Sequence, residues 1–404
     1  MDVAERIQVA EELCSFEERR AGTDAERRAA NRLAQRLREQ GRPAEVEPTY
    51  VHPQYGLVHA VHCALGFSGS LLAVEVPVAG FALVLFAALS TYLDLTYRIY
   101  LVRSLLFRRA SQNVVSPGPN PNAPLRVILC ANYDAAKTGW VFAPQRARRA
   151  ARWAQGRPPV GPFRILFWSL VALLPLLGAR MAGVESDGIA VAQLPFTLAL
   201  LIGAFLLVDI ELSAVAPGAN SNASGVATAL SLAAELDADP PDHADVWILL
   251  TGAEEPQQEG MRAFLRAHRR ELDRDRTLFV NVTSVGHGEV RYETAAGWVA
   301  GYGLDSRAIE LCAAIAEAQP EQTAKPLAHG LATDALPPRV RGIRSIGISC
   351  LDADGYVPNY RLGSDTPDTL DPSALDRAHA FALDLIRALD RDAGRAAAVP
   401  ATAQ

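Results

Sequence analysis

The distribution of hydrophobic and polar positions divides the chain into two kinds of block. Most of the chain alternates short apolar runs with amphipathic segments, whereas residues 56–92 and 163–208 are almost entirely apolar. A strand buried on both faces gives a short apolar run without polar alternation, as residues 125–130 do. The pattern therefore predicts an α/β domain interrupted by two apolar insertions.

The alternating part of the chain predicts a doubly wound arrangement. Residues 1–41 have the spacing of two helices, the second starting at Thr23 or Asp24 and ending at Gly41. The later segments alternate between strand and helix patterns, which is typical of a mixed, mostly parallel sheet flanked by helices. The other predicted strands are 44–52, 246–251, 278–285 and 345–351, and the other predicted helices are 260–272, 306–318 and 372–389.

Each apolar insertion is long enough for two membrane crossings, because about 20 apolar residues cross the bilayer core. The first is interpreted as a hairpin of spans 56–74 and 76–92 with Glu75 at its turn, and the alternative is one span plus a buried helix. The second contains spans 163–184 and 189–208. Both insertions interrupt one domain and must return the chain to the same side, which favours four transmembrane helices as two hairpins.

Charge predicts the orientation of these spans. Residues 97–109 form a basic amphipathic stretch suited to a membrane surface, and residues 137–164 form a basic loop. The short connections within the hairpins carry only Arg180, so the positive-inside rule places the domain in the cytoplasm and the chain in the cell membrane as a multi-pass protein. The arginines on the domain side are Arg98, Arg103, Arg108, Arg109, Arg146, Arg148, Arg149, Arg152 and Arg157.

Composition excludes several classes of protein. The 404 residues carry a net charge of −6, which argues against nucleic acid as a partner. The five cysteines form no CxxC pair, so neither a zinc ribbon nor a disulfide framework is predicted. The first 50 residues are charged and helical in pattern, and no cleavable signal peptide is expected.

A turn of small residues at Pro217–Asn220 leads into a long apolar helix, which Ser221 or Asn222 is expected to cap. The segment PGANSNASG resembles the G-A-N-D-N-A-S-G segment of the di-zinc aminopeptidases, the family that includes bacterial leucyl aminopeptidases, glutaminyl cyclases and the transferrin-receptor ectodomain. The resemblance covers residues 1–55 and 110–392 and implies that family's fold. In the family the Asp of this segment bridges two zinc ions, and Ser221 takes its place here.

Two further motifs of the family lie at the ends of predicted strands. The H-x-D motif reads Asn132-Tyr133-Asp134, so the resemblance implies that the zinc-binding His is replaced while the carboxylate that orients it, Asp134, is kept. The N-x-D motif reads Asn281-Val282-Thr283, which puts Thr283 at the position of another zinc ligand.

The remaining two motifs keep the residue spacing of the family. A Glu-Glu pair survives as Glu254-Glu255, and the resemblance gives Glu254 the position of the general base and Glu255 that of a zinc ligand. The Y-H-T-x-x-D-T motif spans residues 360–366, with Arg361 in place of the last zinc-binding His and with Asp365 retained. We predict that Arg361 pairs with Glu255, or failing that with Glu254, and takes over part of the charge of the metal.

Four of the five metal-ligand positions are thus substituted, and only Glu255 is a residue of a type that commonly binds zinc. None of the eight histidines occupies a motif position: His59 and His62 are interpreted as helix-packing residues, and loop or surface roles are favoured for His287 and His329 although both could lie near the cleft. No metal or other cofactor is expected, and Glu254 is expected to be idle without metal-activated water.

The sequence favours a membrane-anchored, metal-free relative of these peptidases that binds a peptide, a lipid-like molecule or a protein in the old cleft. Because the second insertion leaves after Asp134 and returns before Ser221, the cleft is expected to border the membrane. The alternatives are an active zinc aminopeptidase with a non-standard metal site and a structural membrane subunit. The predicted cleft residues are Asn132, Ser221, Glu255, Thr283, Arg361 and Asp365, beside Glu254 and Asp134.

The predicted organisation has six parts. They are 1–55 as the N-terminal part of the peptidase-like domain, 56–109 as a transmembrane hairpin plus an interfacial basic helix, 110–162 as the first core strand and a basic loop, 163–208 as the second hairpin, 209–392 as the main part of the domain, and 393–404 as a disordered tail.

Overall fold

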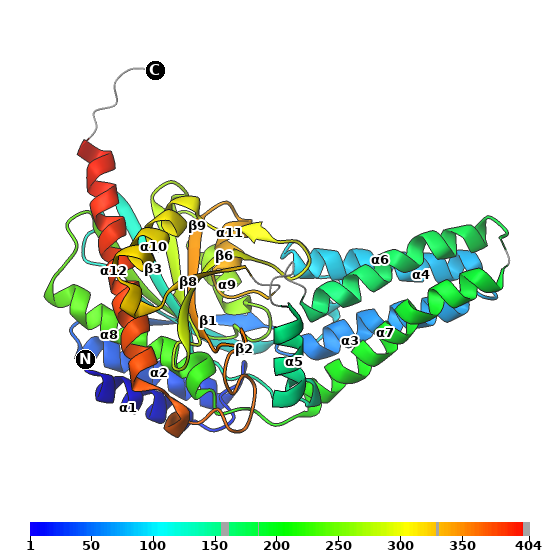
Figure 1. Ribbon diagram of the computed structural model, residues 1–404, viewed down its shortest axis with the longest axis horizontal. Coiled ribbons are helices and arrows are strands. Elements are labelled where there is room, and N and C mark those ends of the chain that lie inside the picture. Colours follow the sequence, from blue (N-terminus) through cyan, green and yellow to red (C-terminus); the bar gives the residue numbers. More distant parts are fainter. Residues whose placement is uncertain (155–160, 185, 329–330, 399–404) are drawn as a thin grey trace, which may run out of the picture.

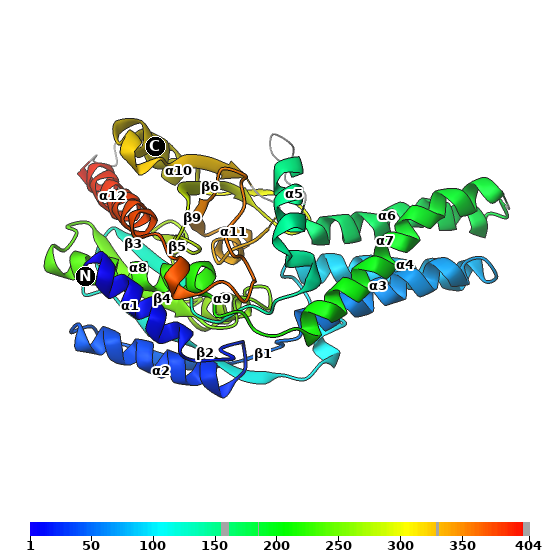
Figure 2. The same cartoon turned by 60° about the horizontal axis from the view of Figure 1, so that its bottom comes forward.

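The structure, a computed structural model, describes residues 1–154, 161–184, 186–328 and 331–398. Within these residues an α/β domain is built on a nine-stranded sheet, and four long helices project from one side of it as a bundle (Figure 1). The predicted mixed, mostly parallel sheet flanked by helices is confirmed. Both insertions leave and rejoin the domain at the same end of the molecule, as the views from two directions show (Figure 2).

The sheet has the order β1-β2-β4-β3-β5-β9-β6-β7, and β8 pairs with β6. Its central strands β4, β3, β5 and β9 are parallel, whereas β1, β2, β6 and β7 join through antiparallel pairs. The strands are β1 (Glu45–Val51), β2 (Arg109–Ser116), β3 (Leu125–Asn132), β4 (Ala244–Thr251), β5 (Thr277–Val282), β6 (Glu289–Ala296), β7 (Tyr302–Gly303), β8 (Lys325–Ala328) and β9 (Arg344–Leu351).

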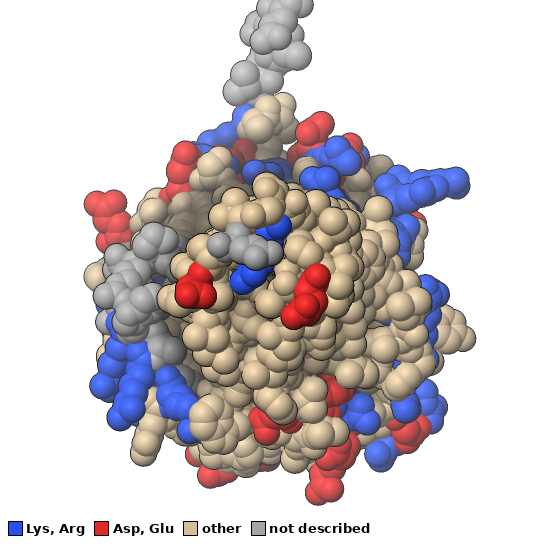
Figure 3. Space-filling view, turned by 90° about the vertical axis from the view of Figure 1, so that its right-hand side faces the viewer, with Lys and Arg blue, Asp and Glu red and all other residues tan. Residues whose placement is uncertain are grey.

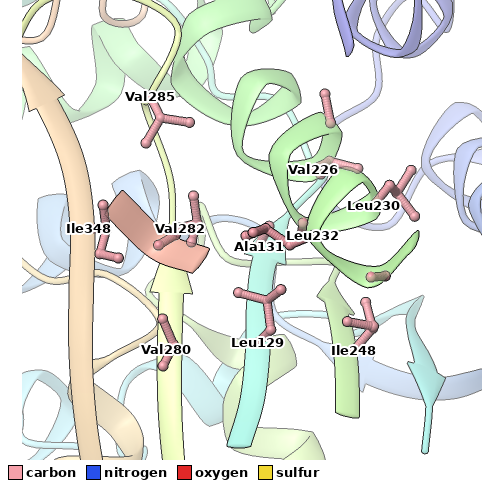
Figure 4. Packing of buried hydrophobic residues seen from close by; sticks show 14 of the residues in the cluster. Leu129, Ala131, Val226, Leu230, Leu232, Ile248, Val280, Val282, Val285 and Ile348 are labelled. Atoms are coloured by element: carbon pink, nitrogen blue, oxygen red, sulfur yellow. The ribbon is translucent and has the colours of Figure 1, made fainter. Parts of the chain in front are cut away.

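Helices cover both faces of the sheet, which explains why β3 has no polar alternation. Leu129 of β3 packs under α8 with Leu230, as Figure 4 shows, whereas Ile128 faces the opposite side with Phe264 of α9. The first face is covered by α1 (Val3–Cys14), α2 (Asp24–Glu39), α8 (Ser224–Ala238), α10 (Ser306–Ala318) and α12 (Pro372–Ala398), and the second by α9 (Glu259–Ala267) and α11 (Leu336–Val340).

The four projecting helices, here called the apolar bundle, are α3 (Tyr55–Leu72), α4 (Pro77–Leu95), α6 (Pro162–Met181) and α7 (Asp187–Leu212). Each is long and apolar enough to cross a membrane. The surface of the bundle seen end-on is almost free of charged side chains apart from a few near its end (Figure 3). Large apolar side chains such as Phe205, which is 70% exposed, and Val78, which is 64% exposed, cover its outside.

Small residues pack the helices within the first hairpin of the bundle, and polar residues connect the two hairpins. A Cβ atom on Gly80 of α4 would lie 2.5 Å from the carbonyl oxygen of Gly69 in α3, so glycine allows this close approach. Between the hairpins, the Gln193 amide of α7 donates to Ser70 Oγ of α3 at 2.7 Å, and Ser70 Oγ lies 2.6 Å from Thr197 Oγ1. Polar groups inside an otherwise apolar bundle thus satisfy one another.

A buried arginine joins the bundle to the domain. Arg103 is fully buried, and its guanidinium donates to the Asp94 carboxylate at 2.7 and 2.9 Å and to Glu259 Oε1 at 3.0 Å. Asp94 lies in the last turn of α4, whereas Glu259 begins α9 in the domain. His59 of α3 reaches the same loop through Gln257 Oε1, 3.0 Å from its Nε2, so its interpretation as a packing residue fits this contact.

Three of the predicted segments need correction. Residues 97–109 are not an interfacial helix: they form a loop with one 3-10 turn (Arg103–Leu105), because Arg103 must reach its buried partners, and β2 begins at Arg109. The basic loop contains helix α5 (Pro144–Ala154), whose alanines and arginines are good helix formers. The tail is helical over residues 393–398, which continue α12, and residues 399–404 lie outside the described residues, as does Arg157.

Several elements and one helix cap differ from the sequence prediction. The part predicted as one core strand contains both β2 and β3, and strands β6, β7 and β8 are additional to the predicted ones. Helix α8 begins with Ala223 as its N-cap, without a side-chain cap, after a π-helical turn over Ala219–Ala223. Neither Ser221 nor Asn222 caps this helix, because both lie within that turn and the backbone amide of Ser221 donates to Asp365.

The buried position of Arg103 leads to a first prediction. Arg103→Gln should lower the free energy of unfolding by about 3 kcal/mol or more, because it leaves two buried carboxylates without their cation. Chemical unfolding in detergent measures this, with Arg98→Gln as the control, since Arg98 is exposed on the same loop. Equal stability of the two variants would contradict the prediction.

Candidate functional site

Most of the residues that the sequence singles out meet at one edge of the sheet. Asn132 ends β3, Glu254 and Glu255 follow β4, and Thr283 follows β5. Arg361 lies in the loop between β9 and α12. The carboxyl ends of the parallel strands meet at this edge, which is where open α/β folds bind ligands.

A cavity of about 650 Å³ opens at this edge. Gly161 and Pro162 line it at the start of α6, so it borders the base of the apolar bundle, as the sequence predicts. The polar part of its lining includes Asn132, Ser221, Glu254, Glu255, Gln258, Thr283 and Arg361, and the apolar part includes Trp298, Leu327, Leu331, Val357 and Tyr360.

The loops around the cavity hold strained backbone. Among the described residues nine that are not glycine have a positive φ, and six of these lie in the site loops. Such conformations cost on the order of 1 kcal/mol each and persist where surrounding contacts determine them. The six are Ala253, Gln257, Gln258, Ser284, Asn359 and Arg361, with φ angles of 47°, 65°, 57°, 54°, 61° and 55°.

Asp134 shapes the turn that carries the glutamate pair. Its two carboxylate oxygens accept hydrogen bonds from the backbone amides of Glu254 and Glu255, both at 3.0 Å. The Glu254 side chain lines the cavity and accepts a hydrogen bond from the Gln258 amide at 2.8 Å. Asp134 itself is fully buried behind this turn, so it positions the pair instead of facing the cavity.

Hydrogen bonds connect the residues at three of the positions that the sequence resemblance aligns with metal ligands. Thr283 Oγ1 lies 3.1 Å from Asn132 Oδ1 and 3.1 Å from the carbonyl oxygen of Ser221, each of which can accept its proton. Ser221 Oγ donates to Asp365 Oδ2 at 2.7 Å, and the amide of Asn220 donates to Asp365 Oδ1 at 2.7 Å. Asp365 was predicted in the cleft but is fully buried beneath the Ser221 turn, because it serves these amides.

The predicted ion pair between Arg361 and Glu255 is present. The Arg361 guanidinium donates to Glu255 Oε2 and to the hydroxyl of Tyr55, and the paired side chains are 10% and 12% exposed. Three aromatic rings surround the guanidinium, with centroids 5.6 Å away for Tyr55, 5.1 Å for Phe142 and 5.4 Å for Tyr360. Because Tyr55 begins α3, Arg361 also ties the cavity to the apolar bundle.

Several carboxyl groups are crowded near this pair. Burial raises the pKa of Glu254 well above its ordinary value, and the neighbouring carboxylates of Glu255, Asp334 and Asp134 raise it further. Burial also raises the pKa of Asp134, with Glu255 acting in the same direction. Burial likewise raises the pKa of the neighbouring Asp334, to about 7. A raised pKa favours the neutral, protonated form of each of these crowded carboxyl groups.

The residues at the family's metal positions do not fit two zinc ions. Zinc sites use three or four His, Cys or carboxylate ligands, whereas here only Glu255 offers one and it is bound by Arg361. Asn132, Ser221 and Thr283 contribute amide and hydroxyl groups that already bond to protein. Within the described part of the chain no group of three or more His, Cys, Asp or Glu side chains could hold a metal ion.

The structure brings together six of the eight predicted site residues around the cavity and places Asp134 and Asp365 behind it. His287 does not line the cavity, and His329 lies outside the described residues. The aromatic residues Tyr55 and Phe142 around Arg361 were not expected from the sequence, because the segments that supply them, the start of α3 and the loop before α5, belong to no motif. Tyr360, by contrast, belongs to the motif of residues 360–366, and Gln258 follows the glutamate pair, so both could have been found.

Comparison with known proteins supports the fold. Residues 207–386 match the sequence profile of Peptidase family M28. A zinc aminopeptidase from Bacillus subtilis is 14% identical with a TM-score of 0.56, and the match covers 96% of this chain and 95% of that one. No curated protein sequence matches the chain.

Two further solved structures are similar. The glutaminyl cyclase of Fimbriiglobus ruber is 13% identical with a TM-score of 0.55, over 96% of this chain and 95% of that one. A leucine aminopeptidase precursor from Bacteroides thetaiotaomicron is 13% identical with a TM-score of 0.53, over 96% and 97% of the two chains. At these identities the structures show a shared fold, and the resemblance stated from the sequence motifs is confirmed.

The ion pair can be tested by a double-mutant cycle. Arg361→Ala should lower the free energy of unfolding by on the order of 3 kcal/mol, because it leaves Glu255 with no cation in a partly buried site. Glu255→Ala combined with Arg361→Ala should cost less than the sum of the single variants. Arg152→Ala is the control, since its pair with Asp354 is exposed and should contribute little. Additive effects at Glu255 and Arg361 would show that the pair contributes nothing.

Proposed function

We propose that the protein is a membrane-anchored relative of the zinc aminopeptidases that binds a ligand in its cavity without hydrolysing it. One observation carries the proposal: Arg361 stands at a former metal-ligand position and bonds to Glu255, the one residue there that suits zinc. A guanidinium supplies fixed positive charge but does not activate a water molecule as a metal does. Glu254 would then lack the nucleophile that a general base needs.

The apolar bundle supports the membrane anchor. Its four helices have the length and composition of membrane spans, and their outward-facing side chains are large and apolar. A bundle in water would expose this surface at high cost, whereas lipid solvates it. The arginines of the loops at the base of the bundle favour a cytoplasmic domain by the positive-inside rule.

The position of the cavity suggests the class of ligand. Its lining is polar around Glu254 and Ser221 and apolar around Trp298 and Leu331. It borders Pro162 at the base of α6, which is where the domain would meet the membrane. An amphiphilic ligand, either a lipid-like molecule or a peptide segment next to a membrane span, matches this lining. A purely structural subunit would have no need of a cavity of about 650 Å³.

Purified protein should contain well under one zinc ion per chain and should not hydrolyse aminoacyl reporters, because the donor set is too small. Zinc content by elemental analysis and reporter hydrolysis measure this, with a zinc aminopeptidase of the same fold as positive control. Arg361→His should restore neither property, since three other ligand positions remain unfilled. Stoichiometric zinc that Glu255→Ala removes together with hydrolysis would establish an active peptidase instead.

The same preparation tests ligand binding. Mass spectrometry of extracts should find an amphiphilic molecule with the wild type, and Leu331→Trp should exclude it by narrowing the cavity while the protein stays folded. Leu331 suits this test because it lines the cavity and is 36% exposed, which leaves room for a larger ring. Equal recovery from both proteins would place the molecule elsewhere, on the lipid-facing surface of the bundle.

Orientation is tested by single cysteines in a background without native cysteines. Glu75→Cys and Val184→Cys, at the tips of the two hairpins, should react with impermeant reagents only from outside the cell. Arg391→Cys, on α12 in the domain, should react only after the membrane is opened. Labelling of all three from the same side would contradict the proposed topology.

A further inference from the structure

Helix α5 is a strongly basic element with no role in the proposed ligand chemistry. It carries Arg146, Arg148, Arg149 and Arg152, and all four are exposed. Arg146 lies over the ring of Trp140, 3.6 Å from its centroid, and Trp140 is itself 60% exposed. Arginines beside an exposed tryptophan are typical of protein surfaces that contact lipid headgroups.

The position of α5 along the bundle is also consistent with contact with lipid headgroups. The backbone amide of Trp140 donates to Asp209 Oδ2 of α7 at 2.6 Å, which fixes the start of the α5 segment against the end of that helix. On either side of Asp209, Val208 is 38% exposed and Leu212 is 82% exposed. Exposed apolar side chains thus continue along α7 as far as the level of α5. Both cartoons show α5 at the junction of bundle and domain (Figures 1 and 2).

The arginines of α5 exceed the acidic partners around them. Arg152 donates to both carboxylate oxygens of Asp354 at 2.8 and 2.9 Å, and Arg148 lies 4.0 Å from Asp352. Arg149 has no acidic partner among the described residues. Exposed pairs of this kind are weak and are screened by salt, so they leave the arginines available to another anion.

We infer that α5 binds anionic lipid headgroups at the membrane surface, next to the mouth of the cavity. The inference rests on the proposed membrane anchoring. A phosphate-bearing headgroup complements several exposed arginines at the depth where the apolar surface ends, and guanidinium groups bind phosphate through paired hydrogen bonds. Figure 3, which looks along the apolar bundle, shows Lys and Arg side chains gathered to one side of it.

Headgroup binding would also act on the cavity. Ala151 of α5 lines the cavity, and so do Asp352 and Gly355 of the loop to which α5 is paired. An anionic headgroup competes with Asp352 and Asp354 for the same arginines, so it would loosen α5 from that loop. The mouth of the cavity would then respond to the lipid composition of the membrane.

The test counts lipids retained by the full-length protein in detergent. Wild-type protein offered equal amounts of phosphatidylglycerol and phosphatidylcholine should retain the anionic lipid preferentially in native mass spectrometry. Arg148→Gln combined with Arg149→Gln should reduce this preference by on the order of tenfold, because each basic residue near the surface adds to the attraction. The matched control is Arg391→Gln with Arg395→Gln, two exposed arginines of α12, which lies on the far side of the domain from the bundle (Figure 1).

Hydrogen exchange of residues 144–154 in nanodiscs gives a second readout. Protection should rise with phosphatidylglycerol in the wild type and should be lost at high salt or in the Arg148/Arg149 double variant. An unchanged lipid preference and unchanged protection in that variant would overturn the inference. Alkaline extraction of membranes distinguishes the two proposals: protein that washes out but keeps its lipid preference contradicts the anchor, whereas retained protein without preference contradicts the headgroup site.

Discussion

A buried guanidinium needs hydrogen-bond acceptors that compensate its charge, and at Arg103 two acidic acceptors join the two halves of the molecule. One partner, Asp94, comes from α4 of the apolar bundle, and the other, Glu259, comes from the domain. The loop before Glu259 carries Glu254 and Glu255, so the segment that shapes the cavity is fixed by the bundle. Another buried arginine, Arg361, acts in the same way, since it binds Glu255 and the first residue of α3. Residues of both the domain and the apolar bundle therefore determine the shape of the cavity.

The site keeps the framework of a metal centre while its polar groups satisfy one another. Asp134 still orders the turn of the glutamate pair, and Asp365 still holds the turn around Ser221. Arg361 supplies a positive charge beside Glu255, and the amide and hydroxyl groups of Asn132, Ser221 and Thr283 bond to neighbouring protein groups. Backbone strain at six residues of these loops remains, which indicates that the loops are held in a defined shape and are suited to bind a ligand.

The central sheet could be predicted from sequence because its strands are buried on both faces and show as apolar runs, as residues 125–130 do. Two other elements could not: β2 begins with the mostly polar residues of Arg109–Asn113, and α5 is an Ala- and Arg-rich segment without large aliphatic residues. The pair of Arg361 with Glu255 could be predicted from the sequence, because each residue occupies a recognisable position in one of two family motifs. The aromatic surroundings of Arg361 could not be predicted, because Tyr55 at the start of α3 and Phe142 in the loop before α5 come from segments whose position depends on three-dimensional packing.

The places at which the hairpins interrupt the sheet have a consequence for biogenesis. The first hairpin separates β1 from β2, which pair along their whole length from Glu45↔Val115 to Val51↔Arg109, and the second separates the parallel neighbours β3 and β4. In the proposed membrane topology, neither pair can form until the intervening helices have returned the chain to the same side of the bilayer. Completion of the sheet would then report that both hairpins have inserted, and a chain whose helices stall would present unpaired central strands to chaperones and proteases.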